Sequence, residues 1–274
     1  MFEITVIFIL CNFCKGATMS SSFTIERRNK LAQILIAEGS VKVGKLAEMF
    51  GVSTETIRKD LIYLDEKGIA TKGHGGAIAS GNILAIEQPL ARKNTEHLDI
   101  KDKISHVAVQ LVPEKGVVIL DTGSTVQCVA KALVVKSRLT IISNAINIVQ
   151  PLSGTDNDIF LVGGKFRSSS LATVGMWGVN AFQSLNADIV FLGTDGLKHR
   201  NGPCTASYEE AEIKSAMVKS SRLRVVVSDS TKFNSSGLFQ FCDWSDIDYF
   251  ITDSGIPEME LKKLENLTDV IIID

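Results

Sequence analysis

From residue 117 onward, the chain alternates between short apolar segments and segments with the periodicity of helices. The apolar segments read VVILD, LTIIS, DIFLVGG, ADIVFLGTDG, LRVVVSDSTKF, DYFITD and DVIIID. Helical spacing fills most of the gaps between them, as in VQCVAKALV and SYEEAEIKSAMVKSS. Short apolar strands that alternate with helices are typical of a parallel sheet covered on both faces. We therefore predict an α/β domain with a mainly parallel sheet over residues 99–274.

Small and hydroxyl-bearing residues follow five of these predicted strands, in the segments DTGST, SNA, GGKFRSSS, GTDG and SDSTKF. In parallel sheets of this kind, ligands bind beyond the carboxyl ends of the strands. Backbone NH groups in such loops can approach an anion closely, and the positive end of a helix that begins near Thr125 favours a phosphate. One such loop is commonly only a turn. Five in register predict a single shared pocket.

DTGST, at residues 121–125, also contains the short motif that surrounds the catalytic aspartate of aspartic proteases. Such an enzyme needs two carboxylates that share a proton. This chain has one DTGS, because residues 193–196 read GTDG, and a predicted helix follows it. The context therefore argues against a protease. We expect Asp121 instead to cap that helix or to accept a hydrogen bond from a sugar hydroxyl.

Three short predicted helices precede the α/β segment. Gly51 ends the second helix, and Ser53 is a suitable N-cap for the third, STETIRKDLIYLDEKG. Two helices joined by a short Gly-containing turn form helix-turn-helix geometry, in which the second helix can enter the major groove of DNA. The residues expected to face the core are Leu31, Ile34 and Leu35, then Leu46, Ala47 and Phe50, then Ile57, Leu61 and Leu64.

Polar and basic residues gather at the start of the third helix and at the tip of the strand-turn-strand IATKGHGGAIA, which we interpret as a wing. Short hydroxyl side chains and Arg can reach base edges, whereas Lys pairs with phosphate. Residues 24–80 contain nine Lys or Arg and seven Asp or Glu. Because this net charge of +2 gives only weak attraction to DNA, we expect two copies of the domain to bind together to gain specificity. The expected DNA contacts are Ser53, Thr54, Glu55, Thr56, Arg58, Lys59, Lys72 and His74.

The first 18 residues, MFEITVIFILCNFCKGAT, form an apolar extension. The run is shorter than the roughly 20 residues of a spanning helix and has no basic segment before it. We interpret it as a non-native or disordered extension upstream of a natural start at Met19, with a real anchor as the alternative. Cys11 and Cys14 form a lone CxxC with no second pair, so we predict no metal site. The odd number of cysteines, five in all, fits a reducing compartment and a cytoplasmic protein.

Two sets of segments resemble the DeoR family of bacterial sugar-metabolism repressors. ERRNKLAQIL and VKVGKLAEMFGVSTETIRKDLIYLDEKGIATKGHGGA are similar to its N-terminal winged helix-turn-helix. ILDTGSTVQCVAKAL, TIISNAINI, LVGGKFR, DIVFLGTDGL, EEAEIKSAM and VVVSDSTKFN are similar, in that order, to its C-terminal sensor domain. The resemblance implies a winged helix-turn-helix at 24–80, a linker at 81–98 and a sensor at 99–274. It also implies a sensor fold related to ribose-phosphate isomerase and glucosamine-phosphate deaminase.

The resemblance further implies an effector, a phosphorylated sugar or related metabolite, with no cofactor. Lys59 stands where many members have Arg, which makes a phosphate contact more expected there than a base contact. The segment PCTAS at 203–207 matches no subgroup and leaves the identity of the effector open. The expected effector-binding residues are Asp121, Thr122, Gly123, Ser124, Thr125, Asn144, Gly163, Gly164, Lys165, Asp195, Glu210, Lys214 and Lys232.

Two functions compete on this evidence. The first is a repressor that binds operator DNA as a homo-oligomer, a dimer or tetramer, without membrane attachment. The second is a sugar-phosphate isomerase or deaminase, which needs a general base such as Asp121, Asp195 or Glu210. A phosphate-binding loop serves binding as readily as catalysis, and only a repressor explains the N-terminal helix-turn-helix. We therefore expect a regulator and not an enzyme.

Overall fold

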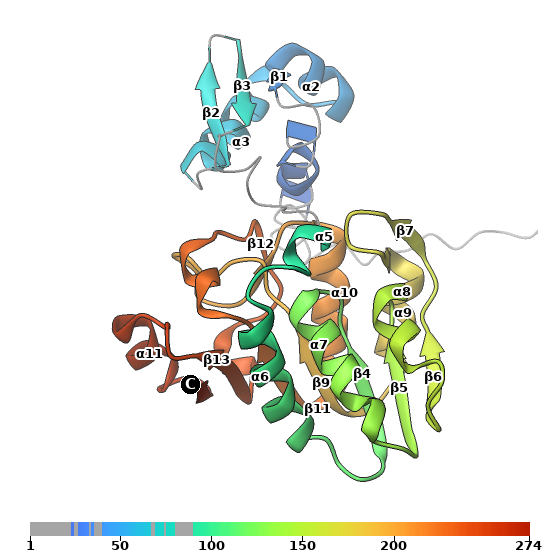
Figure 1. The fold of residues 1–274 in the computed structure, drawn as a ribbon. Coiled ribbons are helices and arrows are strands. Elements are labelled where there is room, and N and C mark those ends of the chain that lie inside the picture. Colours follow the sequence, from blue (N-terminus) through green and yellow to red (C-terminus); the bar gives the residue numbers. More distant parts are fainter. Residues whose placement is uncertain are drawn as a thin grey trace, which may run out of the picture. The chain divides into compact units, whose positions relative to one another are not determined.

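The computed structural model describes residues 23–24, 27–32, 34–35, 40–66, 69–73, 75–79 and 90–274. Contacts divide the chain into two units, Met1–Leu84 and Ala85–Asp274. The first is blue to cyan and the second green to red in Figure 1. The predictions for residues 1–18, including Cys11 and Cys14, and the prediction for His74 lie outside the described residues.

The N-terminal unit contains the predicted helix-turn-helix and wing. Gly51 ends the first of the two helices in the left-handed conformation, with a φ of 62°. The Oγ of Ser53 then accepts a hydrogen bond from the NH of Thr56 at 3.1 Å, which confirms the predicted N-cap. An additional strand, between the first and second predicted helices, joins the wing in a three-stranded antiparallel sheet of order β1-β3-β2. The elements are β1 (Ser40–Lys42), α2 (Val43–Phe50), α3 (Thr54–Glu66), β2 (Ala70–Gly73) and β3 (Gly76–Ala79).

A buried carboxylate links α3 to the start of the described part of this unit. Asp60, on the inward side of α3, accepts hydrogen bonds from Arg27 at 2.6 Å and from Arg28 at 2.8 Å, and its side chain is 2% exposed. The guanidinium of Arg28 also lies 4.1 Å from the centre of the Tyr63 ring. Two of the cations counted toward DNA binding therefore hold α3 against the residues that precede it.

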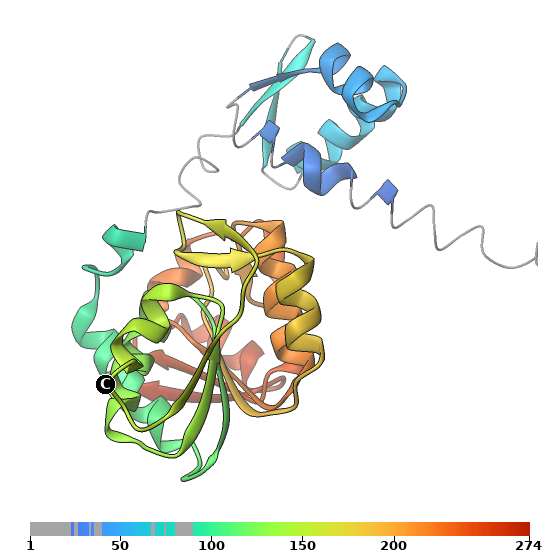
Figure 2. The same ribbon diagram turned by 90° about the vertical axis from the view of Figure 1, so that its right-hand side faces the viewer.

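The second unit is built on one parallel sheet of seven strands in the order β14-β13-β11-β9-β4-β5-β6. Its strands are β4 (Gly116–Leu120), β5 (Leu139–Ser143), β6 (Asp158–Leu161), β9 (Ala187–Leu192), β11 (Ser221–Val227), β13 (Tyr249–Asp253) and β14 (Asp269–Ile273). The helices α6 (Leu98–Gln110) and α7 (Ser124–Ala132) lie on one face, and α9 (Met176–Gln183) and α10 (Tyr208–Lys219) on the other (Figure 2). The predicted fold class is confirmed.

The strand order reverses between β4 and β9. From β4 the chain builds outward through β5 to β6, and from β9 it builds in the other direction to β14. The two central strands are apolar on both faces, and Ile119, Leu120, Val190 and Phe191 are completely buried. A reversal of this kind leaves a crevice at the carboxyl ends of the two strands. DTGST follows β4 and GTDG follows β9, so both loops meet there.

Several short elements were not predicted. GGKFRSSS, expected as a loop, contributes β7 (Lys165–Arg167), which pairs with β8 (Ala172–Val174) because the chain turns back on itself between them. The expected linker at 81–98 contains the helix α5 (Leu90–Lys93), and Leu98 already belongs to α6. The other unpredicted elements are β10 (Cys204–Thr205), β12 (Phe239–Gln240), α11 (Glu258–Leu264) and short 3-10 helices at Leu133–Val135, Gln150–Leu152, Ser230–Asn234 and Trp244–Asp246. By contrast, α8 (Ile146–Val149) lies in a gap between strands for which a helix was predicted.

Candidate functional site

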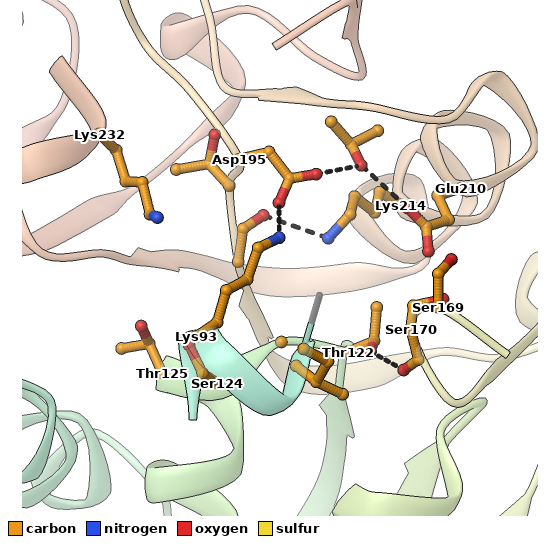
Figure 3. Close-up of a pocket in the computed structure, with 15 residues that line it drawn as sticks. Lys93, Thr122, Ser124, Thr125, Ser169, Ser170, Asp195, Glu210, Lys214 and Lys232 are labelled. Carbon is orange, nitrogen blue, oxygen red and sulfur yellow. Dashed lines mark hydrogen bonds and ion pairs between the residues drawn. The ribbon is translucent and has the colours of Figure 1, made fainter. Parts of the chain in front are cut away.

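A pocket lies at the reversal point, beyond the carboxyl ends of β4 and β9 (Figure 3). Polar and charged side chains dominate its walls, and they come from loops and helices far apart in the sequence. Such a convergence of polar groups at one concave site is typical of a small-molecule site. The lining residues are Leu90, Lys93, Thr122, Gly123, Ser124, Thr125, Ser169, Ser170, Gly193, Thr194, Asp195, Thr205, Glu210, Lys214 and Lys232.

The start of α7 forms one wall. Gly123 precedes the helix with a φ of 125°, a conformation that L side chains rarely adopt, and no side chain caps the helix there. Among the described residues, no side chain is therefore hydrogen-bonded to the first NH groups of α7, and the helix dipole places partial positive charge on the pocket side. Thr122 donates a hydrogen bond from Oγ1 to the carbonyl of Ser170 at 2.9 Å, which ties this loop to the β7–β8 turn. The wall suits an anion.

Asp121 lies beneath the pocket and does not cap α7, which was one of the two roles predicted for it. Its side chain is 1% exposed, pairs directly with the ammonium of Lys214 and accepts from the NH of Gly193 at 2.9 Å. The Lys214 ammonium also donates to the carbonyl of Gly193 at 3.1 Å. Burial raises the pKa of Asp121, against the opposing effect of Lys214. This buried pair links β4, β9 and α10 and forms the floor of the site.

Two carboxylates at the other side share a threonine. Asp195 pairs with Lys93 at 2.6 Å, and its pKa falls well below its usual range because the cations Lys93 and Lys214 outweigh the effect of burial. Thr205 Oγ1 lies 3.0 Å from Asp195 and 3.1 Å from Glu210. Burial raises the pKa of Glu210, although Arg167 lies 3.2 Å away. These oxygens can accept hydrogen bonds from the hydroxyl groups of a ligand.

Besides Asp121, four residues predicted for this site do not line it. Asn144, in the loop after β5, donates from Nδ2 to the carbonyl of Thr173 at 2.7 Å, so it anchors β8 instead. Lys165 is in the β7–β8 hairpin, where its side chain is 71% exposed and pairs with Glu209 at 3.2 Å. Gly163 and Gly164 lead into the same hairpin and are likewise absent from the lining. The hairpin carries these residues away from the pocket.

Several lining residues were missing from the predicted set. Ser169 and Ser170 belong to the predicted GGKFRSSS loop, and their position in the β7–β8 turn brings them to the pocket. Lys93 lies in the expected linker, and Thr205 lies in PCTAS, the segment that matched no subgroup. A Lys four residues beyond Pro89 and a Thr flanked by Cys and Ala carry no local signal of a ligand.

The predicted DNA-contacting residues of α3 lie on its outer side. Arg58 and Lys59 are exposed, as are Ser53, Thr54 and Glu55, whereas Ile57, Leu61 and Leu64 of the same segment are buried as predicted. Arg58 lies 3.6 Å from Glu55, and Lys72 in the wing lies 3.7 Å from Asp65. Exposed pairs of this kind are weak, so both cations remain available to phosphate or base edges.

Neither a membrane span nor a metal cluster is present in the part of the chain that the structure describes. None of its helices there is long and apolar enough to cross a membrane. No group of three or more His, Cys, Asp or Glu side chains in the same residues could hold a metal ion.

Comparison with known proteins connects both units to one family. Residues 27–81 match the DeoR-like helix-turn-helix domain, and residues 96–254 match the DeoR C terminal sensor domain. A protein of Escherichia coli O157:H7 assigned as the aga operon transcriptional repressor is 32% identical, covering 91% of this chain and 94% of its own. The glycerol-3-phosphate regulon repressor of Escherichia coli K12 is 27% identical, covering 89% and 95%. Among solved structures, ribose 5-phosphate isomerase A from Methanocaldococcus jannaschii is 18% identical over 49% of this chain and 53% of its own, with a TM-score of 0.36. The chain belongs to the DeoR family of DNA-binding transcriptional regulators.

Proposed function

We propose that the chain represses a carbohydrate-utilisation operon and that a phosphorylated sugar or related metabolite, bound in the pocket between β4 and β9, controls its binding to operator DNA. One observation carries the proposal. The uncapped start of α7 and the ammonium of Lys232, which forms no ion pair among the described residues, lie in the same pocket as Asp195 and Glu210. The first two suit a phosphate, and the carboxylates suit sugar hydroxyls.

The related proteins agree with this assignment. One is named as a repressor of a glycerol-3-phosphate regulon, and glycerol 3-phosphate combines a phosphate with hydroxyl groups. A helix-turn-helix domain gains sequence specificity when two copies bind neighbouring half-sites of DNA. We therefore propose that the chain acts as a homo-oligomer, a dimer or tetramer, on its operator.

An isomerase or deaminase function receives less support. Proton abstraction needs a carboxylate near neutral pKa that can reach the substrate. Asp195 is held by Lys93 with a lowered pKa, and Asp121 is covered by Lys214. Glu210 lines the pocket and its pKa is raised by burial, but its carboxylate is already engaged by Arg167 at 3.2 Å and by Thr205 at 3.1 Å. The curated relatives are named as regulators. The chain is a regulator and not an enzyme, and purified protein is expected to leave ribose 5-phosphate and amino sugar phosphates unchanged.

A thermal-shift screen with phosphorylated sugars, glycerol 3-phosphate included, tests the proposal. A ligand at 100 times its dissociation constant stabilises the folded protein by about 2.7 kcal/mol. For a unit of this size the melting temperature then rises by roughly 5 to 11 °C. Lys232→Gln should reduce the shift, whereas Lys131→Gln, which removes a charge from α7 outside the pocket, should preserve it. If no phosphorylated compound shifts the transition, the proposed effector class is wrong.

Binding to DNA from the chain's own locus tests the other half of the proposal. The wild-type protein should retain such DNA at moderate salt, and the active phosphorylated sugar should change the apparent affinity. The Lys232→Gln variant should bind the same DNA but respond less to the sugar. A protein that retains no DNA from its locus would contradict the repressor assignment.

A further inference from the structure

We propose that Lys93, at the end of α5, binds the anionic group of the effector and leaves Asp195 when it does so. The inference rests on the proposed function, because it requires an anion in the pocket. α5 presents two side chains to the pocket, Leu90 and Lys93, which are three positions apart and therefore share one face of the helix. α5 is also the first described element after residue 79, where the described part of the DNA-binding unit ends. Lys93 therefore lies in the described helix of the second unit that comes first in the sequence after the DNA-binding unit.

Lys93 is better placed for this exchange than Lys214. The Lys214 side chain is 4% exposed, and its withdrawal would leave the buried carboxylate of Asp121 without a counter-ion. The Lys93 and Asp195 side chains are 16% and 18% exposed, so water reaches both, and separating them costs less. Figure 3 shows the Lys93 side chain pointing into the pocket, toward Asp195.

The backbone of Lys93 is fixed independently of its side chain. Lys101, a buried residue of α6, donates hydrogen bonds from its ammonium to the carbonyls of Lys93 and Glu96, each at 2.6 Å. The end of α5 is therefore anchored to α6, while the Lys93 ammonium can change partner. That change alters the connection between α5 and the loop after β9.

Asp195 keeps other partners when Lys93 leaves. Its Oδ2 accepts from the NH of Ala206 and from Thr205 Oγ1, both at 3.0 Å, whereas Lys93 contacts Oδ1. The released Oδ1 then becomes an acceptor for a ligand hydroxyl. The exchange therefore favours ligands that carry both an anionic group and a hydroxyl group. A simple anion would contact Lys93 but would leave Oδ1 of Asp195 without a ligand hydroxyl.

Phosphate binding by charge variants of the full chain tests the inference. The probe is inorganic phosphate, titrated by isothermal calorimetry. Lys93→Gln should weaken binding about tenfold or more, since a charge-assisted contact is lost, and Lys93→Arg should retain it. Asp195→Asn should tighten binding, because it removes a carboxylate that competes with phosphate for the Lys93 ammonium. The matched control is Arg92→Gln, which removes a cation from the same helix at an exposed position that pairs with Glu96 and lies outside the pocket.

The double variant separates release of Lys93 from a general loss of negative charge. If Lys93 mediates the effect, Asp195→Asn should tighten phosphate binding in the wild type and not in Lys93→Gln. Equal tightening in both backgrounds, or equal binding by Lys93→Gln and Arg92→Gln, would overturn the inference and leave the proposed pocket intact. A wild-type protein that binds neither phosphate nor any phosphorylated sugar would overturn the proposed function, and this inference with it.

Hydrogen exchange gives a second measurement that a purely structural role would not affect. Saturating phosphate should change the exchange of residues 90–97 in the wild type and in Arg92→Gln. The same residues should show no phosphate-dependent change in Lys93→Gln, even at concentrations that saturate the variant. A phosphate-dependent change that persists in Lys93→Gln would mean that α5 responds through another residue.

Discussion

Removing the ammonium of Lys214 should destabilise the second unit strongly and in a pH-dependent way. In Lys214→Met the apolar stem is kept, but the carboxylate of Asp121, which is 1% exposed, loses its counter-ion. The variant loses both the electrostatic attraction and the hydrogen bond of Lys214, which lower the pKa of Asp121 against the effect of burial. The pKa of Asp121 therefore rises further. An ordinary Asp carboxyl has a pKa of about 3.9, roughly three units below pH 7. At about 1.36 kcal/mol per pKa unit, protonating it at pH 7 costs about 4 kcal/mol. We therefore expect a loss of about 3 to 4 kcal/mol.

The sign of the pH dependence follows from that raised pKa. A carboxyl whose pKa is higher in the folded state favours folding in its protonated form, so the destabilisation is small below the unfolded pKa of about 3.9. It grows as the pH rises and becomes constant above the folded pKa. The loss caused by Lys214→Met should therefore be larger at pH 8 than at pH 5.

Tryptophan fluorescence can follow the second unit alone, because Trp177 and Trp244 both lie in it. Trp244 is buried and lies 5.1 Å from Phe250, centre to centre, so unfolding changes its surroundings. The expected loss corresponds to a decrease in melting temperature of roughly 6 to 16 °C at pH 7. The double variant Lys214→Met, Asp121→Asn should recover most of it, because no buried charge remains. A single variant that loses less than about 1 kcal/mol at pH 8, or a double variant no more stable than the single one, would refute the reasoning.

Three further variants test other parts of the chain. Arg58→Ala should weaken operator binding by about 1 to 3 kcal/mol, roughly 5- to 150-fold by fluorescence anisotropy, without changing the melting temperature; equal affinity would remove Arg58 from the interface. Asp60→Asn leaves two partly buried guanidinium groups without their carboxylate and should unfold the DNA-binding unit at a lower temperature by circular dichroism, while the tryptophan transition stays unchanged. Gly123→Ala should cost about 1 to 3 kcal/mol from backbone strain alone, since no atom crowds the new methyl group, and should weaken phosphate binding in the same calorimetric titration.

Local patterns were sufficient for much of the fold. The strand LTIIS was predicted with the bounds that the structure shows, since four consecutive apolar or β-branched residues between turn signals specify a buried strand. The cap at Ser53 was also predictable, because it depends on a side chain and an NH group only three residues apart. The strand β1 escaped prediction, because three residues carry too little periodicity of their own.

The pocket was predictable as a kind of site but not in its full membership. Residues after β4 and β9 line it, as parallel-sheet geometry predicts. Long-range contacts determine which other segments of the chain line the pocket. Asp121 meets Lys214 across 93 positions, and Lys93 meets Asp195 across 102. A short sequence pattern contains no information on such pairings. For the same reason, the contact of Asn144 with the carbonyl of Thr173 in β8 could not be predicted from the loop after β5.

The span of the pocket has a consequence for the order in which the protein is made. The described part of the DNA-binding unit ends at residue 79, whereas the pocket requires residues from Leu90 to Lys232 and the pairing of β4 with β9. Because domains generally fold as units during synthesis, starting from the N-terminus, the DNA reader can be complete while most of the sensor is still untranslated. A nascent or truncated chain would then be able to bind DNA without being able to respond to a metabolite.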